Sequence, residues 1–308
     1  MKAFKYISVA GLLWFLCATS LAQTRTGAVI EEIAGTGSLK KGSNATEQPL
    51  SDRDLGYVLA VGWSIKSNPG GSIVLRLVNK RTHPLTPEDG WFNIPLSQGS
   101  AQSSLGRALD RYSKPGNIER PTKSIIYSPA PDSAVDVQTM EIRWLPRPAS
   151  QIVALEIREK EGNNSRIWRL AGINGSDGSL NAQEARSALR NYRASNGSGS
   201  LLLIISDQDG NESSVEFTVL SANEERKIGR ELDEWEQPTY SGSLTRHIAR
   251  AQTFASHNLM AEAAHEYDEA LRLAPRSLAL IKAALDAHIR TGNTIREQEL
   301  RALLQTEQ

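Results

Sequence analysis

The spacing of apolar residues changes at about residue 221, and this change constrains the fold more than any other feature. Before it, short runs rich in Val, Ile and Leu are separated by Gly, Pro, Asn and Ser clusters, as in β-strands joined by tight turns. After it, apolar residues recur every three or four positions, as in amphipathic helices. We therefore predict a multidomain chain, with sandwich-like all-β N-terminal and middle domains followed by an α-helical domain.

Residues 1–22 have the three parts of a secretory signal peptide. Two lysines precede an apolar run over residues 7–18, and Ser20 and Ala22 supply the small side chains of a cleavage site. The run has about 12 residues, whereas about 20 are needed to cross a bilayer. We expect cleavage between Ala22 and Gln23, a periplasmic or secreted protein, and no transmembrane segment after cleavage.

The only cysteine, Cys17, lies inside this segment, so the mature chain would have none. This excludes disulfides, a thiol nucleophile and thiolate metal ligands, and the domains must be held together by packing. Lys plus Arg and Asp plus Glu both total 35, so no excess positive charge attracts nucleic acid. We predict no nucleic-acid partner, no metal and no cofactor.

Residues 23–98 predict a β-rich N-terminal domain, because β-branched runs alternate there with glycine-containing turns. A turn at Gly37 to Leu39, a leucine and aspartate step at Pro49 to Asp52, and a long strand within Pro69 to Leu77 follow in order. This order resembles the periplasmic domain of the ferric-citrate sensor family. The resemblance implies a β-rich fold outside the cytoplasm.

Residues 99–123 are polar and rich in Gly, Ser and Pro, which predicts a linker or an extended loop. One short helix is possible within it, because Leu105, Leu109 and Tyr112 fall at i, i+4 and i+7.

Residues 124–220 carry about six strand signals and predict a β-sandwich. Met140, Ile142 and Trp144 alternate with charged neighbours, so their strand should have one buried face. Asp207 to Asn211 predicts a hairpin turn, and Asn181 with Glu184 predicts a capping box that begins a short helix. Trp144 followed by Pro146, Arg147 and Pro148 resembles the start of an immunoglobulin or fibronectin type III domain.

Residues 221–308 predict a helical domain. Ser221 and Glu224 form a capping box before a helix that Pro238 ends. Four more helical segments are predicted over 244–256, 259–274, 277–291 and 295–304.

The second and third of these five helices resemble one tetratricopeptide repeat. Small or aromatic residues stand where that repeat has them, at Ala251, Phe254, Ala263, Tyr267, Ala270 and Pro275. The resemblance implies a groove that binds a protein partner. Its lining would be Thr245, Ile248, Gln252, Ala255, Ser256, Lys282, Asp286, Ile289 and Arg290. Binding a partner and simply capping the chain or pairing with a second copy remain equal alternatives.

No catalytic motif is complete. His265 has Glu269 at i+4 where a zinc protease has a second histidine, and Ser38 with Lys41 lacks the other elements of its enzyme class. We predict a non-enzymatic envelope protein that binds a protein partner or a second copy through residues 221–308. The alternatives are a carbohydrate- or peptidoglycan-binding module, based on Trp63, Trp91 and Tyr112, and an envelope hydrolase.

Overall fold

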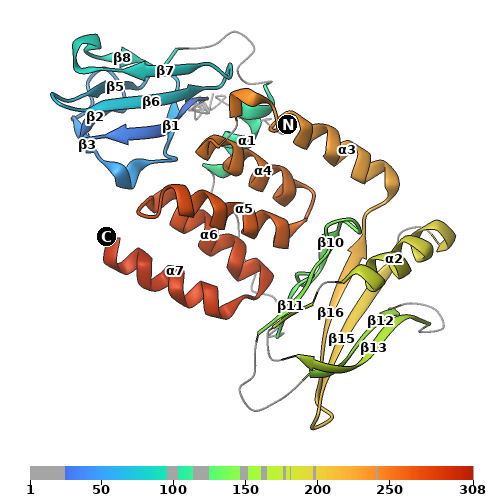
Figure 1. The fold of residues 1–308 in the computed structure, drawn as a ribbon. Helices are drawn as coiled ribbons and strands as arrows, with labels where there is room; N and C mark the ends of the chain where they lie inside the picture. Colours follow the sequence, from blue (N-terminus) through green and yellow to red (C-terminus); the bar gives the residue numbers. More distant parts are fainter. Residues whose placement is uncertain are drawn as a thin grey trace, which may run out of the picture.

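The computed structural model describes residues 25–95, 103–113, 125–145, 152–160, 165–175, 178–180, 182–196, 199–240 and 242–307. The predicted signal peptide lies outside these residues. Two β-rich domains and a group of helices are visible in Figure 1, and the predicted order of β domains followed by helices is confirmed. Among the described residues, none of the helices combines the length and apolar character needed to cross a membrane.

The N-terminal domain consists of two four-stranded antiparallel sheets. The first, in the order β4-β1-β6-β7, contains β1 (Thr26–Ala34), β4 (Val58–Ala60), β6 (Ser72–Leu77) and β7 (Thr82–Leu85). The second, in the order β3-β2-β5-β8, contains β2 (Gly37–Lys40), β3 (Gln48–Leu50), β5 (Ser64–Ser67) and β8 (Phe92–Asn93). Two single-turn helices, Asp52–Asp54 and Pro87–Asp89, connect strands. Inward-facing Ile30, Leu39 and Ile65 form the core between the sheets.

The middle domain has a five-stranded sheet and a three-stranded sheet. The larger, in the order β10-β16-β15-β12-β13, contains β10 (Ser133–Val135), β12 (Ile152–Glu159), β13 (Arg166–Gly175), β15 (Ser200–Asp207) and β16 (Glu212–Val219). The smaller, in the order β14-β11-β9, contains β9 (Ile126–Ser128), β11 (Ile142–Trp144) and β14 (Ser179–Leu180). Helix α2 (Gln183–Asn196) packs its Ala185 and Leu189 into the same core. Only β10 and β16 pair in parallel within these sheets.

Two local predictions for the middle domain are confirmed. Met140, Ile142 and Trp144 are all buried, so their alternation does mark the core face. The turn between β15 and β16 is closed by the Asp207 carboxylate, which accepts hydrogen bonds from the backbone N–H groups of Asp209 and Asn211 at 3.0 and 2.8 Å. The proposed capping residue Asn181 lies outside the described residues.

The C-terminal region forms five helices, α3 (Ala222–Asp233), α4 (Leu244–Ser256), α5 (Met260–Leu273), α6 (Leu278–Thr291) and α7 (Thr294–Glu307), with a single turn at Pro238–Tyr240. The predicted capping box at Ser221 and Glu224 is present. Helices α4 to α7 pack one after another, and we call them the helical stack. Ser243 and Ser277 accept hydrogen bonds at the starts of α4 and α6, and Gly292 ends α6 in a left-handed conformation.

The short helix that the sequence allowed within the expected linker at residues 99–123 is present as α1 (Ser104–Tyr112). Its apolar stripe is buried, because Leu105 and Leu109 are 0% exposed and lie in one core with residues of α4. This stretch of the expected linker is therefore a structural element of the helical region.

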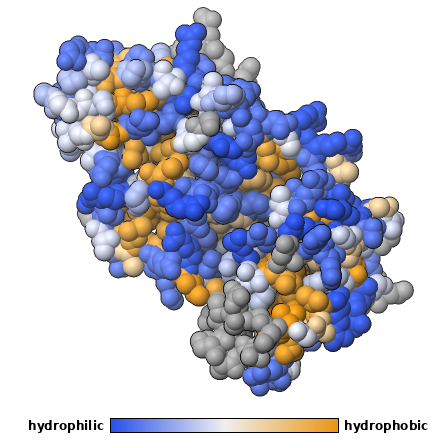
Figure 2. Space-filling model, in the orientation of Figure 1, coloured by the Kyte–Doolittle hydropathy of each residue, from blue (hydrophilic) through white to orange (hydrophobic). Residues whose placement is uncertain are grey.

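The stack lies between the two β domains, although it follows both in sequence (Figure 1). On its N-terminal-domain side, Val29 and Val78 join Tyr240 and the helices in one apolar cluster. Gly56 faces the stack at this junction, where its positive φ favours glycine over other residues. Its φ is +73°, and an added Cβ would lie 3.4 Å from Leu280 and 3.5 Å from Ile248. Figure 2 shows a largely hydrophilic surface in which apolar side chains gather where the N-terminal domain meets the helices.

Candidate functional site

A cleft of about 910 Å³ lies between the N-terminal domain, α1 and helices α4 to α6. We call it the interdomain cleft. Tyr57 and Val58 contribute to one wall, and Tyr267 and Lys282 contribute to the other. Tyr112, at the end of α1, also lines it. The cleft is thus built by three segments that are far apart in the sequence.

Two tyrosines form a polar and aromatic part of the lining. The rings of Tyr112 and Tyr267 stack with centroids 6.3 Å apart, and the Gln252 amide donates a hydrogen bond to the Tyr267 hydroxyl. Burial raises the pKa of both tyrosines, so they stay protonated. The buried Tyr112 hydroxyl has no hydrogen-bond partner among the described residues. Such groups are normally satisfied, but this oxygen has almost no exposed surface, so it is enclosed by the protein and not open to an occupant of the cleft.

The charges along the cleft favour a negatively charged occupant. Arg290 and Asp286 form an ion pair at 3.3 Å, and burial raises the pKa of Asp286. One oxygen of Asp286 has no hydrogen-bond partner among the described residues. Four basic side chains line the cleft against two acidic ones. They are Arg53, Arg111, Lys282 and Arg290 against Asp54 and Asp286. Arg53 is paired with Glu307 at 3.0 Å and Arg290 with Asp286, so the positive charge left for an occupant comes from Arg111 and Lys282.

Strand β4 gives the cleft a backbone surface. It is the edge strand of its sheet and pairs with β1 only, among the strands described. Val58 and Ala60 of β4 line the cleft. The outer edge of such a strand presents N–H and C=O groups to which an extended peptide can hydrogen-bond.

The nine predicted groove residues fall into three groups in the structure. Those that line the cleft are Gln252, Ala255, Lys282, Asp286 and Arg290. Thr245, Ile248 and Ile289 are instead 0%, 0% and 6% exposed, and a partner cannot reach them. Ser256 is exposed at the end of α4 and is not part of the lining.

The residues predicted to pack the helix pair lie as follows. Ala251, Ala263 and Ala270 are 0% exposed, and Tyr267 is buried. Phe254 is partly buried and packs against Leu259 and Ile228, whereas Pro275 is exposed between α5 and α6. Small side chains at the contact allow α4 and α5 to pack closely.

Sequence reasoning missed the contribution of the N-terminal domain. Arg53 and Asp54 lie in the single-turn helix Asp52–Asp54, and local signals such as its Ser51 cap say nothing about contact with a distant helix. The stripe of Leu105, Leu109 and Tyr112 was the one available signal, since an apolar stripe on a helix needs a partner surface.

The three aromatic residues of the carbohydrate hypothesis have different surroundings. Trp63 lines the cleft and stacks with Tyr57 at 6.3 Å, and Tyr112 packs against Tyr267. Trp91 lies outside the cleft and is covered by the ammonium groups of two lysines, at 4.3 and 4.7 Å from its ring centroid.

The weak catalytic and metal motifs do not assemble into sites among the described residues. The Ser38 hydroxyl donates to Asn68, whereas the Lys41 ammonium lies over the rings of Tyr57 and Trp63. His265 and Glu269 are an ordinary i, i+4 pair with 3.7 Å between their nearest atoms. Within the described ranges, no group of three or more His, Cys, Asp or Glu residues could hold a metal ion.

Comparison with known proteins gives no match to a protein-family model and none to a curated protein.

Proposed function

We propose that this chain is a non-enzymatic, exported adaptor that binds an extended acidic segment of a partner protein in the interdomain cleft. The observation that carries the proposal is the meeting of the edge strand β4 with Gln252, Lys282 and Arg290 in one cleft. A peptide could pair with the strand through its backbone and meet basic side chains on the helices. The excess of basic over acidic lining groups favours an acidic segment.

In this proposal the helical stack is a short tetratricopeptide-like array. Its sequence pattern and its consecutive packing of α4 to α7 support that assignment. The exposed side of α7 carries Gln298, Glu299 and Arg301, which suits a solvent-facing cap. A polar cap favours a partner in the cleft over a second copy of the chain added to the end of the stack.

The test compares proteins captured from cell envelopes by the full chain and by an Arg111→Glu/Lys282→Glu variant. Both side chains are exposed, so their reversal should change the charge of the cleft without unfolding the protein. The matched control is Arg272→Glu, on an exposed arginine of α5 outside the cleft lining. We expect one protein to be retained by the wild type and the control but lost with the double variant.

Synthetic peptides tiled across the retained protein then identify the segment. One acidic tile should bind the wild type and compete with the whole partner. If the double variant retains the same proteins as the wild type, the cleft is not the binding site.

A glycan chain is the second candidate occupant. The stacked Tyr57 and Trp63 rings in the cleft favour it, because sugars pack on aromatic faces. The Lys41 ammonium lies over both rings, so a glycan on that face would have to displace it. Adding envelope glycans should then shift the tryptophan fluorescence of the wild type but not of Trp63→Leu. An unchanged wild-type spectrum argues against glycan binding.

A further inference from the structure

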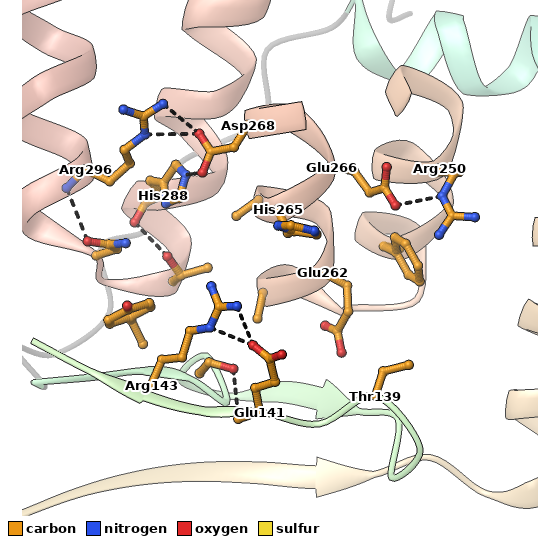
Figure 3. Close-up of a pocket in the computed structure, with 17 residues that line it drawn as sticks. Thr139, Glu141, Arg143, Arg250, Glu262, His265, Glu266, Asp268, His288 and Arg296 are labelled. Atoms are coloured by element: carbon orange, nitrogen blue, oxygen red, sulfur yellow. Dashed lines mark hydrogen bonds and ion pairs between the residues drawn. The ribbon is translucent and has the colours of Figure 1, made fainter. Parts of the chain in front are cut away.

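A second cavity, of about 350 Å³, lies on the other side of the stack, against the middle domain (Figure 3). We call it the charged pocket. Thr139, Glu141 and Arg143 line it from the middle domain, and α4 to α7 line it from the stack. It shares no lining residue with the interdomain cleft, and its occupant can be considered independently of the proposed function.

The arginines that line the charged pocket are already neutralised by carboxylates. Each guanidinium donates from Nε to an acidic side chain at 2.6 to 3.0 Å. The pairs are Arg143 with Glu141, Arg250 with Glu266, and Arg296 with Asp268. These pairs leave no free guanidinium for an anion, so the pocket does not favour an anionic ligand.

Glu262 is the exception among the acidic lining residues. It lies in the first turn of α5, beside Thr139 in Figure 3, and forms no ion pair with a described residue. Thr139 lies beside Glu262 and its hydroxyl favours the ionised carboxylate, while the charges of Asp136 and Glu141 oppose its ionisation. Burial raises the pKa of Glu262 to about 7. Its carboxyl group faces the cavity, which gives it intermediate exposure, but protein atoms crowd it on the other sides.

The unfavourable negative charge of a carboxylate in this setting can be removed or balanced in two ways. It can take up a proton, or a cation can enter the pocket and pair with it. A divalent metal would need several oxygen or nitrogen ligands, and the described residues offer no group of three. An ammonium group needs fewer contacts, and it can donate to both Glu262 and the Thr139 hydroxyl oxygen.

The same pocket has an apolar part for the remainder of such a ligand. Phe254, Ala261 and Ala264 contribute to its lining. An alkyl chain attached to the ammonium group would remove these apolar surfaces from water. A cavity of about 350 Å³ is at the small end of the range for organic ligands.

We propose that the charged pocket binds a small organic amine, with its ammonium group between Glu262 and Thr139 and its alkyl chain toward Phe254. Binding requires the ionised carboxylate, so the amine displaces a proton from Glu262 when the pH is near or below neutral. Other charged or titratable groups also face this site. From the middle domain they are Tyr127, Asp136, Glu141 and Arg143, and from the stack Arg250, His265, Glu266, Asp268, His288 and Arg296.

The test is isothermal titration of the full chain with n-butylamine at pH 6.5, in two buffers with different ionisation enthalpies. We expect saturable binding with release of protons, seen as a difference in heat between the buffers. Glu262→Gln keeps the shape of the side chain but removes its charge, and should weaken binding at least about tenfold. The matched control, Glu47→Gln, changes an exposed glutamate of the N-terminal domain and should bind as the wild type does.

A second variant and a neutral ligand separate the alternatives. Thr139→Val removes one hydrogen bond and should weaken binding roughly fivefold, with the fold checked by circular dichroism. 1-Butanol has the same chain length and no charge, and should not bind. The proposal is overturned if butylamine gives no saturable heat, if it binds Glu262→Gln as well as the wild type, or if 1-butanol binds equally well. Should Glu262→Gln fail to fold, the proton release and Thr139→Val still decide the outcome.

Discussion

The helical stack meets the two β domains in different ways. Toward the N-terminal domain, the contact is a continuation of the stack's own apolar core, with Val29 and Val78 in the same cluster as Trp235 and Tyr240. Toward the middle domain, the apolar contact is a small separate cluster built around Ala134, Leu220, Ile228 and Leu259. That junction also includes the charged pocket, whose lining is mostly polar and charged.

Each of the two junctions also contains hydrogen bonds. The Ser277 hydroxyl, at the start of α6, donates to the Leu55 carbonyl and ties the stack to the N-terminal domain. At the other junction, the Ala134 N–H donates to the Asn258 carbonyl at 3.0 Å. Because apolar burial provides most of the cooperativity of unfolding, the N-terminal domain and the stack should unfold together. The middle domain should unfold as a separate unit.

The largest expected effect comes from Trp235→Ala. Trp235 is 2% exposed, its indole N–H donates to Thr253 at 3.1 Å, and its ring meets Tyr240 edge-on. Its loss should cost about 3–5 kcal/mol and should lower hydrogen-exchange protection in β1 and α4 alike. Trp144→Ala is the matched control, because Trp144 is equally buried but belongs to the middle-domain core. Trp144→Ala should lose a similar free energy of unfolding, but its loss of hydrogen-exchange protection should be confined to the middle domain. If the hydrogen-exchange protection of β1 is unchanged in Trp235→Ala, the N-terminal domain and the stack do not unfold together.

A buried ion pair lies at the junction between the N-terminal domain and the stack. Arg76 Nε donates to Glu31 at 2.9 Å, both side chains are under 10% exposed, and the guanidinium lies 5.4 Å from the Tyr240 ring centroid. Glu31→Leu leaves the Arg76 charge buried and unpaired, and should cost about 3 kcal/mol in urea unfolding. Glu31→Leu/Arg76→Met should recover most of that loss. If the double variant is as unstable as the single one, the ion pair is not what limits stability there.

The polar junction with the middle domain should respond to pH. The pKa of Glu262 is raised to about 7 from an ordinary 4.5, so the folded state holds a proton that the unfolded state releases between these values. Stability should therefore fall as the pH rises from about 4.5 through 7, by up to about 3 kcal/mol. Glu262→Gln should remove this part of the pH dependence. Compared with the wild type, it should be clearly more stable at pH 8 and similar at pH 5. If the stability of Glu262→Gln differs from that of the wild type by the same amount at both pH values, the pH dependence does not come from Glu262.

The sequence was sufficient for local structure in the helical region. The predicted segments 244–256 and 277–291 agree with α4 and α6 to within a residue, because apolar spacing, serine caps and Gly292 are all local signals. The repeat resemblance also placed Gln252, Lys282 and Asp286 on the side of the stack that lines the cleft.

The long-range contacts could not be predicted from the sequence. Val29 and Val78 read as ordinary strand residues, and nothing in their spacing says that a helix 200 residues away covers them. The groove residues Ile248 and Ile289 were assigned by analogy with an open repeat groove. Here the N-terminal domain and α1 pack onto that side, so these apolar side chains are buried while their polar neighbours line what remains open.

The smallest effect that we predict concerns Ser277, at the contact between the stack and the N-terminal domain. Ser277 is fully buried, accepts a hydrogen bond from the Leu280 N–H as the cap of α6, and donates to the Leu55 carbonyl. Ser277→Ala removes both contacts and should cost about 1–2 kcal/mol in thermal unfolding. Neighbouring Arg276 is the control. It pairs with Asp52 at 3.0 Å across the same junction, but both side chains are nearly half exposed, so Arg276→Ala should change the midpoint less. If Arg276→Ala proved the more damaging, surface ion pairs rather than buried contacts would join the N-terminal domain to the stack, and the contrast between the two junctions would disappear.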